Sequence, residues 1–163
     1  MQVTTKAIVF SAIKYGDTSL IVKVFTASDG IKSYLLRGVL SSRKGKLKTA
    51  YFQPLTQLEI VANHRNKGTL EILREAKVYY HYQSLYADMA KNAMTLFLAE
   101  LLVNSIREEE RNEELFEFLE ASLQWLDIHK DIANFHLFFM LSITKFLGFY
   151  PDVFQIDKPY FDL

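Results

Sequence analysis

The stretch TTKAIVFSAIKYGDTSLIVKVFT, residues 4–26, decides the fold of the first half of the chain. Residues 4–14 are rich in Ile, Val and Phe. Residues 20–26 alternate in part, with Leu20 and Val22 on one face. Between the two runs, Gly16 tolerates a positive φ and its polar neighbours can bond nearby backbone, as in a tight turn. The sequence therefore predicts two strands joined by a turn.

Three more strands follow from the same pattern of short apolar runs between turn residues. We expect them over residues 31–39, 55–61 and 69–82. Pro54 suits the position just before the second of these, because proline cannot donate a hydrogen bond within a sheet. Five short strands separated by turns predict a small barrel or sandwich.

The spacing of apolar residues becomes helical near Gln83. Residues 86–106 carry apolar side chains on more than one helix face, which indicates burial on several sides. A second helix is expected over residues 113–128 and a third over residues 133–147, just before Gly148.

Together these patterns predict an α+β chain in which the strands come first and the helices second. We place the β-rich domain at residues 1–80 and the helical domain at residues 81–163.

The charge of the chain divides near the same place. Over residues 1–78, nine Lys and four Arg against five acidic residues give +8. Over residues 79–163, four Lys and two Arg against fourteen acidic residues give −8. The stretch RGVLSSRKGKLK, residues 37–48, holds five cations and no anion. Such asymmetry predicts a polyanionic partner for the first half.

Residues suited to nucleic acid gather around the stretch 37–48. Cations bind phosphates by displacing counterions, and aromatic rings stack on unpaired bases. Tyr51 is the preferred stacking residue because it adjoins the loop, whereas the nearby Tyr34 and Phe52 are as well explained by a core. The candidate nucleic-acid-binding residues are Arg37, Arg43, Lys44, Lys46, Lys48, Arg65, Lys67 and Tyr51.

Several function classes find no support in the sequence. There is no cysteine, which removes disulfides and thiolate metal sites, and the four histidines show no metal-ligand spacing. We find no phosphate-binding glycine loop and no nucleophile motif, so we expect neither an enzyme nor a cofactor in this chain. No signal peptide and no apolar run long enough to span a membrane is present, which favours a cytoplasmic protein.

The order and spacing of short segments along essentially the whole chain resemble the RecO family of bacterial recombination mediators and DNA repair proteins. The segments that carry the resemblance are KAIVF (6–10), YGDTSLIV (15–22), FT (25–26), Gly30, RGV (37–39), FQPL (52–55), LE (58–59) and FLGFYPD (146–152), together with the basic stretch.

The resemblance implies an N-terminal OB-fold barrel and a helical second domain. It also implies a nucleoid-associated protein that binds single- and double-stranded DNA, anneals strands and, with RecR, helps to load RecA. Members of the family are typically longer, and many carry a zinc-binding cysteine cluster after the helices. We therefore expect the sequence to be truncated, with any zinc confined to the missing C-terminal segment.

The resemblance further implies that the helical domain binds the acidic C-terminal tail of single-strand binding protein. A groove between apolar helices suits such a peptide. The cations that could hold its carboxylates are Lys91, Arg107, Lys130 and Lys145.

Three interpretations stay open. The glutamates over residues 108–120 are best explained as a helix end, a turn and a solvated helix face, although they could also repel DNA or meet a basic partner. The chain as a whole could instead be a protein-docking adaptor with an auxiliary basic patch. It could also be an OB-fold protein that binds RNA.

Overall fold

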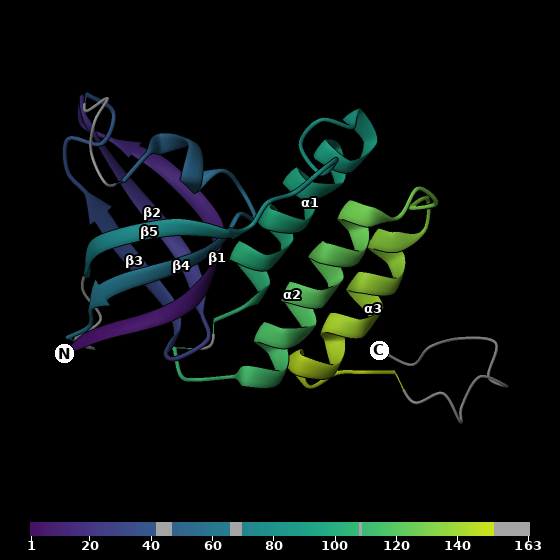
Figure 1. The fold of residues 1–163 in the computed structure, drawn as a ribbon. Helices are drawn as coiled ribbons and strands as arrows, with labels where there is room; N and C mark the ends of the chain where they lie inside the picture. The colour runs from purple at the N-terminus through teal and green to yellow at the C-terminus, as the bar shows by residue number, and fades with distance from the viewer. Residues whose placement is uncertain (42–46, 66–69, 108, 152–163) are drawn as a thin grey trace, which may run out of the picture. The chain divides into compact units, whose positions relative to one another are not determined.

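The computed structural model describes residues 1–41, 47–65, 70–107 and 109–151. Strands come first and helices second (Figure 1), which confirms the predicted β-then-α order. The elements are β1 (Gln2–Tyr15), β2 (Ser19–Thr26), β3 (Gly30–Leu36), the 3-10 helix η1 (Thr49–Phe52), β4 (Gln57–Asn63), β5 (Ile72–Tyr80), α1 (Met89–Ser105), α2 (Glu113–Ile128) and α3 (Phe135–Leu147).

The five strands form one antiparallel sheet in the order β3-β2-β1-β4-β5. Its two edge strands meet through a parallel bridge between Tyr34 and Glu71, where the Glu71 N–H donates to the Ser33 carbonyl oxygen at 2.8 Å. The sheet thereby closes into the five-stranded OB barrel that the resemblance implies.

Alternating side chains fill the barrel. Val9, Val22 and Leu58 belong to a cluster of buried residues contributed by all five strands. On the outside, Phe10 and Phe25 stack at a centroid distance of 5.9 Å, and Phe25 stacks on Phe116 of α2 at 6.2 Å. Helix α2 therefore covers this part of the outer surface of the sheet.

Several strand boundaries differ from the prediction: β1 begins earlier, at Gln2, and β5 spans Ile72–Tyr80 within the expected residues 69–82. Two other differences follow from the conformation of the backbone. The third strand ends at Leu36, since Gly38 adopts a left-handed φ of 69°. The fourth begins at Gln57, since Leu55 has φ 62°, an uncommon conformation for a non-glycine residue. Leu55 is fully buried and its N–H donates to the Val9 carbonyl oxygen at 2.7 Å, which holds this conformation in place.

Two helix starts and one helix end carry recognisable caps. The Asp88 side chain accepts from the Lys91 N–H at the start of α1, and the Asn112 side chain accepts from the Leu115 N–H at the start of α2. Gly148 ends α3 with a left-handed φ of 82°. None of the helices in the described part of the chain is long and apolar enough to cross a membrane.

Backbone contacts divide the chain into two compact units, Met1–Ile132 and Ala133–Leu163. The first unit holds the barrel together with α1 and α2, and the second holds α3. The division into domains after residue 80 stays a prediction.

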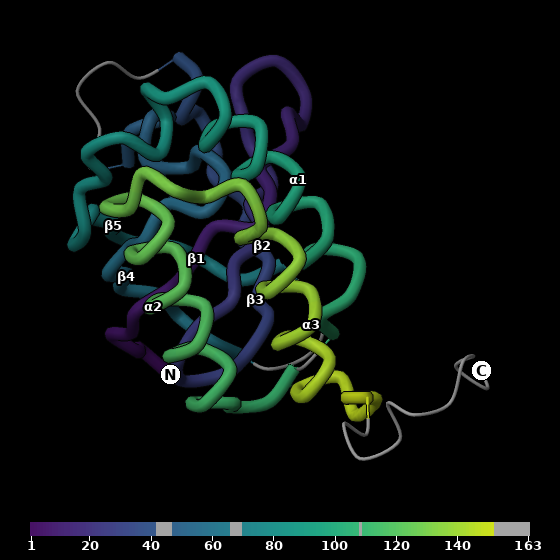
Figure 2. The backbone as a smooth tube through the Cα atoms, turned by 90° about the vertical axis from the view of Figure 1, so that its right-hand side faces the viewer, coloured from purple at the N-terminus to yellow at the C-terminus, as the bar shows by residue number. Residues whose placement is uncertain are grey.

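Helix α2 is joined to the barrel by polar contacts within the first unit. The Glu120 carboxylate accepts from Lys6 Nζ of β1 at 2.8 Å and from the Tyr79 hydroxyl of β5 at 2.5 Å. The Gln124 Nε2 donates to the Gln57 Oε1 of β4 at 3.1 Å. Figure 2 shows α2 running in front of β1, β4 and β5, as these contacts require.

Candidate nucleic-acid interface and partner pocket

Three segments of the barrel meet at one end, which we call the basic end: residues 14–19, 37–41 and 47–51. The Leu40 N–H donates to the Thr18 carbonyl oxygen at 3.0 Å, and the Thr49 hydroxyl donates to the Val39 carbonyl oxygen at 3.4 Å. The β1–β2 turn, the residues after β3 and the residues before η1 therefore form one surface.

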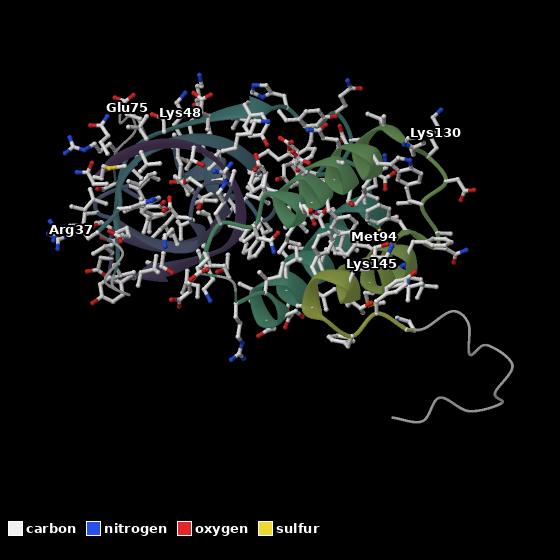
Figure 3. The ribbon with its side chains drawn as sticks, turned by 90° about the horizontal axis from the view of Figure 1, so that it is seen from below. Arg37, Lys48, Glu75, Met94, Lys130 and Lys145 are labelled. Atoms are coloured by element: carbon white, nitrogen blue, oxygen red, sulfur yellow. The ribbon has the colours of Figure 1, made fainter. Side chains whose placement is uncertain are left out.

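The basic end carries three of the candidate nucleic-acid-binding residues. Arg37 and Lys48 are exposed and lie on the barrel in Figure 3. Lys48 Nζ lies 5.8 Å from the centroid of the half-buried Tyr51 ring. Tyr51 is thus partly buried against the core cluster while a cation lies over its ring. The candidates Arg43, Lys44 and Lys46 lie outside the described residues.

The structure does not bring Arg65 to the basic end. Arg65 follows β4, whose last residue, Asn63, pairs with Gln2 at the start of β1. The basic end lies at the other end of the fourteen-residue strand β1. Lys67, the other candidate at this turn, lies outside the described residues. The candidates that the structure describes therefore belong to two separate surfaces of the barrel.

Tyr34 and Phe52, the two aromatics that a core would also explain, are core residues. Both are buried, and the Tyr34 hydroxyl bonds His64 Nε2 at 2.6 Å while His64 Nδ1 bonds Asp29 Oδ2 at 2.9 Å. Burial raises the pKa of Tyr34. At Asp29 burial also opposes ionisation, but hydrogen bonds from Ser28 and His64 outweigh it and leave the pKa of that carboxyl below its ordinary value. The hydrogen-bonded residues Tyr34, His64 and Asp29 therefore have a structural role.

Two of the candidate partner-binding cations line one pocket of about 550 Å³ between the start of α1 and the end of α2. Lys130 is exposed at its rim, away from Arg37 in Figure 3. Lys91 is buried, and its Nζ donates to the Ser84 hydroxyl at 2.7 Å and to the Asp127 carbonyl oxygen at 2.6 Å. The remaining lining residues are Gln83, Ser84, Asp88, Ala90, Asp127, Ile128 and Ile132.

Asp127 fixes one side of the pocket. Its carboxylate accepts the backbone N–H groups of Gln83, Ser84 and Leu85 at 2.8–2.9 Å. Burial would raise the pKa of Asp127, but these three hydrogen bonds and the nearby Lys91 charge hold it below its ordinary value. Both acidic residues of the lining are thus engaged, because Asp88 caps α1.

The other two candidate cations lie elsewhere. Arg107 is exposed just after the end of α1. Lys145 lies in the last turn of α3, in the second unit, and its Nζ is 4.6 Å from the centroid of the Tyr150 ring. Neither lines the pocket.

The glutamates of the acidic stretch do not share one environment. Glu109, Glu110, Glu114 and Glu117 are exposed, as the interpretation of a solvated face requires, and Glu113 pairs with Arg111 at 2.8 Å. Glu120 differs, because it joins α2 to the barrel. Glu108 lies outside the described residues.

Sequence reasoning did not identify Ser84 and Asp127, which are 43 residues apart and meet only in the folded chain. No local pattern signals such a pair. Among the described residues, no group of three or more His, Asp or Glu side chains is arranged to hold a metal ion.

The chain therefore belongs, by its fold, to the OB-fold proteins, and the barrel carries a positively charged surface at one end. Family models identify the member of that class: residues 1–82 match the model "Recombination protein O N terminal" and residues 86–155 match "Recombination protein O C terminal". The chain belongs to the RecO family of DNA repair and recombination proteins.

Individual relatives agree with the family models. The chain is 56% identical over 163 residues to a protein of Flavobacterium johnsoniae and 58% identical over 163 residues to one of Christiangramia forsetii, each named "DNA repair protein RecO". Both alignments cover the whole chain and 69% and 68% of the relatives, respectively. A Phocaeicola vulgatus protein of the same name is 41% identical over 91% of the chain and 61% of its own length.

Proposed function

We propose that the chain binds single- and double-stranded DNA through the basic end of its OB barrel and promotes annealing of complementary strands. The observation that carries the proposal is that the segments carrying Arg37, Lys48 and Tyr51 lie at one end of a barrel that belongs to a DNA repair family. Cations there can contact phosphates of any sequence, and Tyr51 can stack on a base.

In this proposal the protein acts by binding and not by catalysis. It works with RecR to help load RecA onto DNA covered by single-strand binding protein, in the bacterial cytoplasm at the nucleoid. The exposed glutamates of α2 support DNA binding on the barrel. Their negative charge repels the phosphates of DNA from the helix and so favours the basic end.

A strand-annealing assay tests the proposal directly. Two complementary labelled oligonucleotides should anneal faster with the chain present, and the double variant Arg37→Glu/Lys48→Glu should lose most of the acceleration. Equal annealing by both proteins would exclude the basic end. Competition of bound single-stranded DNA by RNA of the same length separates DNA from RNA: equal competition by RNA would favour an RNA-binding protein.

The pocket between α1 and α2 supports a second role, docking of the acidic C-terminal tail of single-strand binding protein. Lys130 at the rim offers a cation to carboxylates, and Ile128 and Ile132 offer an apolar wall. Lys91 lines the pocket as well, although its Nζ also holds Asp127 and Ser84.

Charge reversal at the rim tests this docking site. We expect Lys130→Glu to weaken binding of a tail peptide about ten-fold or more in a titration, because it replaces an attraction by a repulsion. The matched control is Lys145→Glu, a reversal of an exposed lysine that does not line the pocket. Equal effects of the two substitutions would contradict this placement.

A further inference from the structure

A small pocket lies between the barrel and the first half of α1, within the first unit of the chain. Its volume is about 220 Å³, below the roughly 300–1,000 Å³ of sites for drug-sized ligands, so it suits a single ring system. One wall comes from the segment between η1 and β4, and the other from α1 and the residues just before it. The residues that line this pocket, which we call the amide pocket, are Gln53, Pro54, Tyr86, Asn92, Thr95 and Leu96.

Hydrogen bonds fix the barrel wall of the amide pocket. The Thr56 N–H donates to the Gln53 carbonyl oxygen at 3.2 Å, and the positive φ of 62° at Leu55, just after Pro54, matches a type II turn. The Tyr86 hydroxyl donates to the Pro54 carbonyl oxygen at 2.9 Å and is also bonded to the Thr56 hydroxyl at 2.8 Å. The wall is therefore formed before any ligand arrives, which lowers the entropic cost of binding.

The chemistry of the amide pocket is that of an uncharged, flat ligand. The described residues that line it carry no charge. Gln53 and Asn92 are exposed, and within the described part of the chain neither side-chain amide has a hydrogen-bond partner. Each amide offers two N–H donors and an acceptor oxygen, while Pro54 and Leu96 offer apolar surface.

A nucleobase has the matching chemistry. Its edge carries hydrogen-bond donors and acceptors, and its faces are apolar enough to pack against side chains. Adenine suits an Asn or Gln side chain best, because one amide can donate to its ring nitrogen and accept from its amino group at the same time.

The amide pocket also adjoins the basic end. Gln53 follows Tyr51 by two residues, and the Tyr51 N–H donates to the Lys48 carbonyl oxygen at 3.0 Å. Two residues span at most about 7 Å, which is roughly two nucleotide steps along a strand. A strand whose phosphates contact Lys48 therefore has a base within reach of the pocket. An extended peptide could also bond the two amides, but it brings no phosphate for Lys48.

We propose that the amide pocket holds one unpaired base of single-stranded DNA, adenine in preference, with Gln53 and Asn92 hydrogen-bonded to the edge of the base. This inference rests on the proposed DNA binding and deepens it, because it adds to a surface for phosphates of any sequence a site at which the identity of the base matters. A paired base is held in the stack of its duplex and does not enter.

The test is the affinity of the whole 163-residue chain for four DNA probes of equal length, measured by fluorescence anisotropy. The probes are an oligo-dT with interspersed dA, plain oligo-dT, an abasic strand that keeps only the sugars and phosphates, and a duplex. Gln53→Ala/Asn92→Ala should weaken binding of the strand with dA roughly ten-fold. Binding of the abasic strand and of the duplex should stay unchanged, because no phosphate contact is lost.

The base preference gives a second readout. The unaltered chain should bind the strand with dA several-fold more tightly than plain oligo-dT, and the double alanine variant should bind the two strands alike. Equal affinity of the unaltered chain for both strands would overturn the proposal.

Asn104→Ala is the matched control, at an exposed position near the other end of α1. Asn104 lies twelve residues after Asn92, which is about 18 Å along a helix, and its amide donates to the Glu100 carbonyl oxygen. This substitution should leave all four affinities unchanged. Circular dichroism and urea midpoints confirm that each variant is folded.

Failure of this inference can be told apart from failure of the proposed function. If Arg37→Glu/Lys48→Glu weakens binding of single strands but Gln53→Ala/Asn92→Ala does not, the amide pocket holds no base and the basic end remains. That result overturns the inference even if the alanine variant loses a peptide partner. Equal losses for the strand with dA and for the abasic strand would also overturn it. If the unaltered chain binds no DNA, both proposals fall together.

Discussion

One buried polar residue, Asp127, stabilises the segment that connects the barrel to the helices. Asp127 near the end of α2 accepts three successive backbone N–H groups from the segment that links β5 to α1. Lys91 of α1 then donates to the carbonyl oxygen of the same aspartate. One residue thus ties the linking segment, α1 and α2 together, and its removal leaves buried donors without an acceptor.

We expect Asp127→Asn to lower the free energy of unfolding by about 2–3 kcal/mol, because an amide offers one acceptor oxygen and turns a donor toward the backbone N–H groups. Since the folded pKa of Asp127 lies below its ordinary 3.8, the stabilisation is complete above about pH 3.8 and is lost as the pH falls through the folded pKa. Urea titrations at pH 7 and near pH 3 measure both effects.

The exposed Asp131, four residues farther along, provides the control. Asp131→Asn should change the free energy of unfolding by less than about 0.5 kcal/mol at either pH. A difference between Asp127→Asn and the unaltered chain that stays constant down to pH 3 or lower would contradict the assigned role of the carboxylate.

Residue roles were the part that the sequence predicted least well. Tyr34 is an aromatic residue near the basic stretch, as a stacking residue would be, but its hydroxyl is bonded to His64, which follows β4. Lys91 is a cation on a helix, but it is buried against a residue 36 positions away. Both outcomes depend on contacts between distant parts of the chain, which no local pattern encodes.

At the scale of elements, turn chemistry and periodicity predicted the five strands and three α-helices of the described residues. Several boundaries were displaced by two or three residues, as for α1, which spans Met89–Ser105 and not residues 86–106. The start of β4 differs because backbone conformation, and not apolar content, sets it. Leu55 adopts a left-handed φ that a leucine does not signal, and η1 precedes it without a cap hydrogen bond. The closure of the barrel by Tyr34 and Glu71 is a contact between strands that are not neighbours in sequence.

The N-terminal caps of two helices give a prediction at this scale. Both α2 and α3 are preceded by an asparagine, but only one of the two side chains makes a cap hydrogen bond. The Asn112 side chain accepts from the Leu115 N–H at 3.0 Å, whereas Asn134 at the start of α3 makes no side-chain cap hydrogen bond. Asn112→Ala should therefore cost about 1 kcal/mol of unfolding free energy, and Asn134→Ala a few tenths at most.

Thermal or urea unfolding followed by circular dichroism compares the two alanine variants directly. Equal losses at both positions would show that the Asn112 hydrogen bond does not stabilise α2.

At the scale of the whole molecule, the charge split follows the change from strands to helices. The positive first half contains an OB barrel whose Arg37 and Lys48 share one end, and the negative second half places exposed glutamates on α2. The sequence predicted this division and the family. It did not predict that Arg65 lies at the other end of the barrel, since only the strand register separates Arg65 from Arg37.

The salt dependence of single-stranded DNA binding tests most directly whether the basic end is the phosphate-binding surface. With about five phosphate contacts, the slope of log affinity against log salt concentration should be roughly −3.5 for the unaltered chain. Arg37→Glu/Lys48→Glu removes two contacts and should bring the slope to about −2, while Arg111→Glu, in the helical half, should leave it unchanged. A slope that is the same in all three proteins would contradict the account.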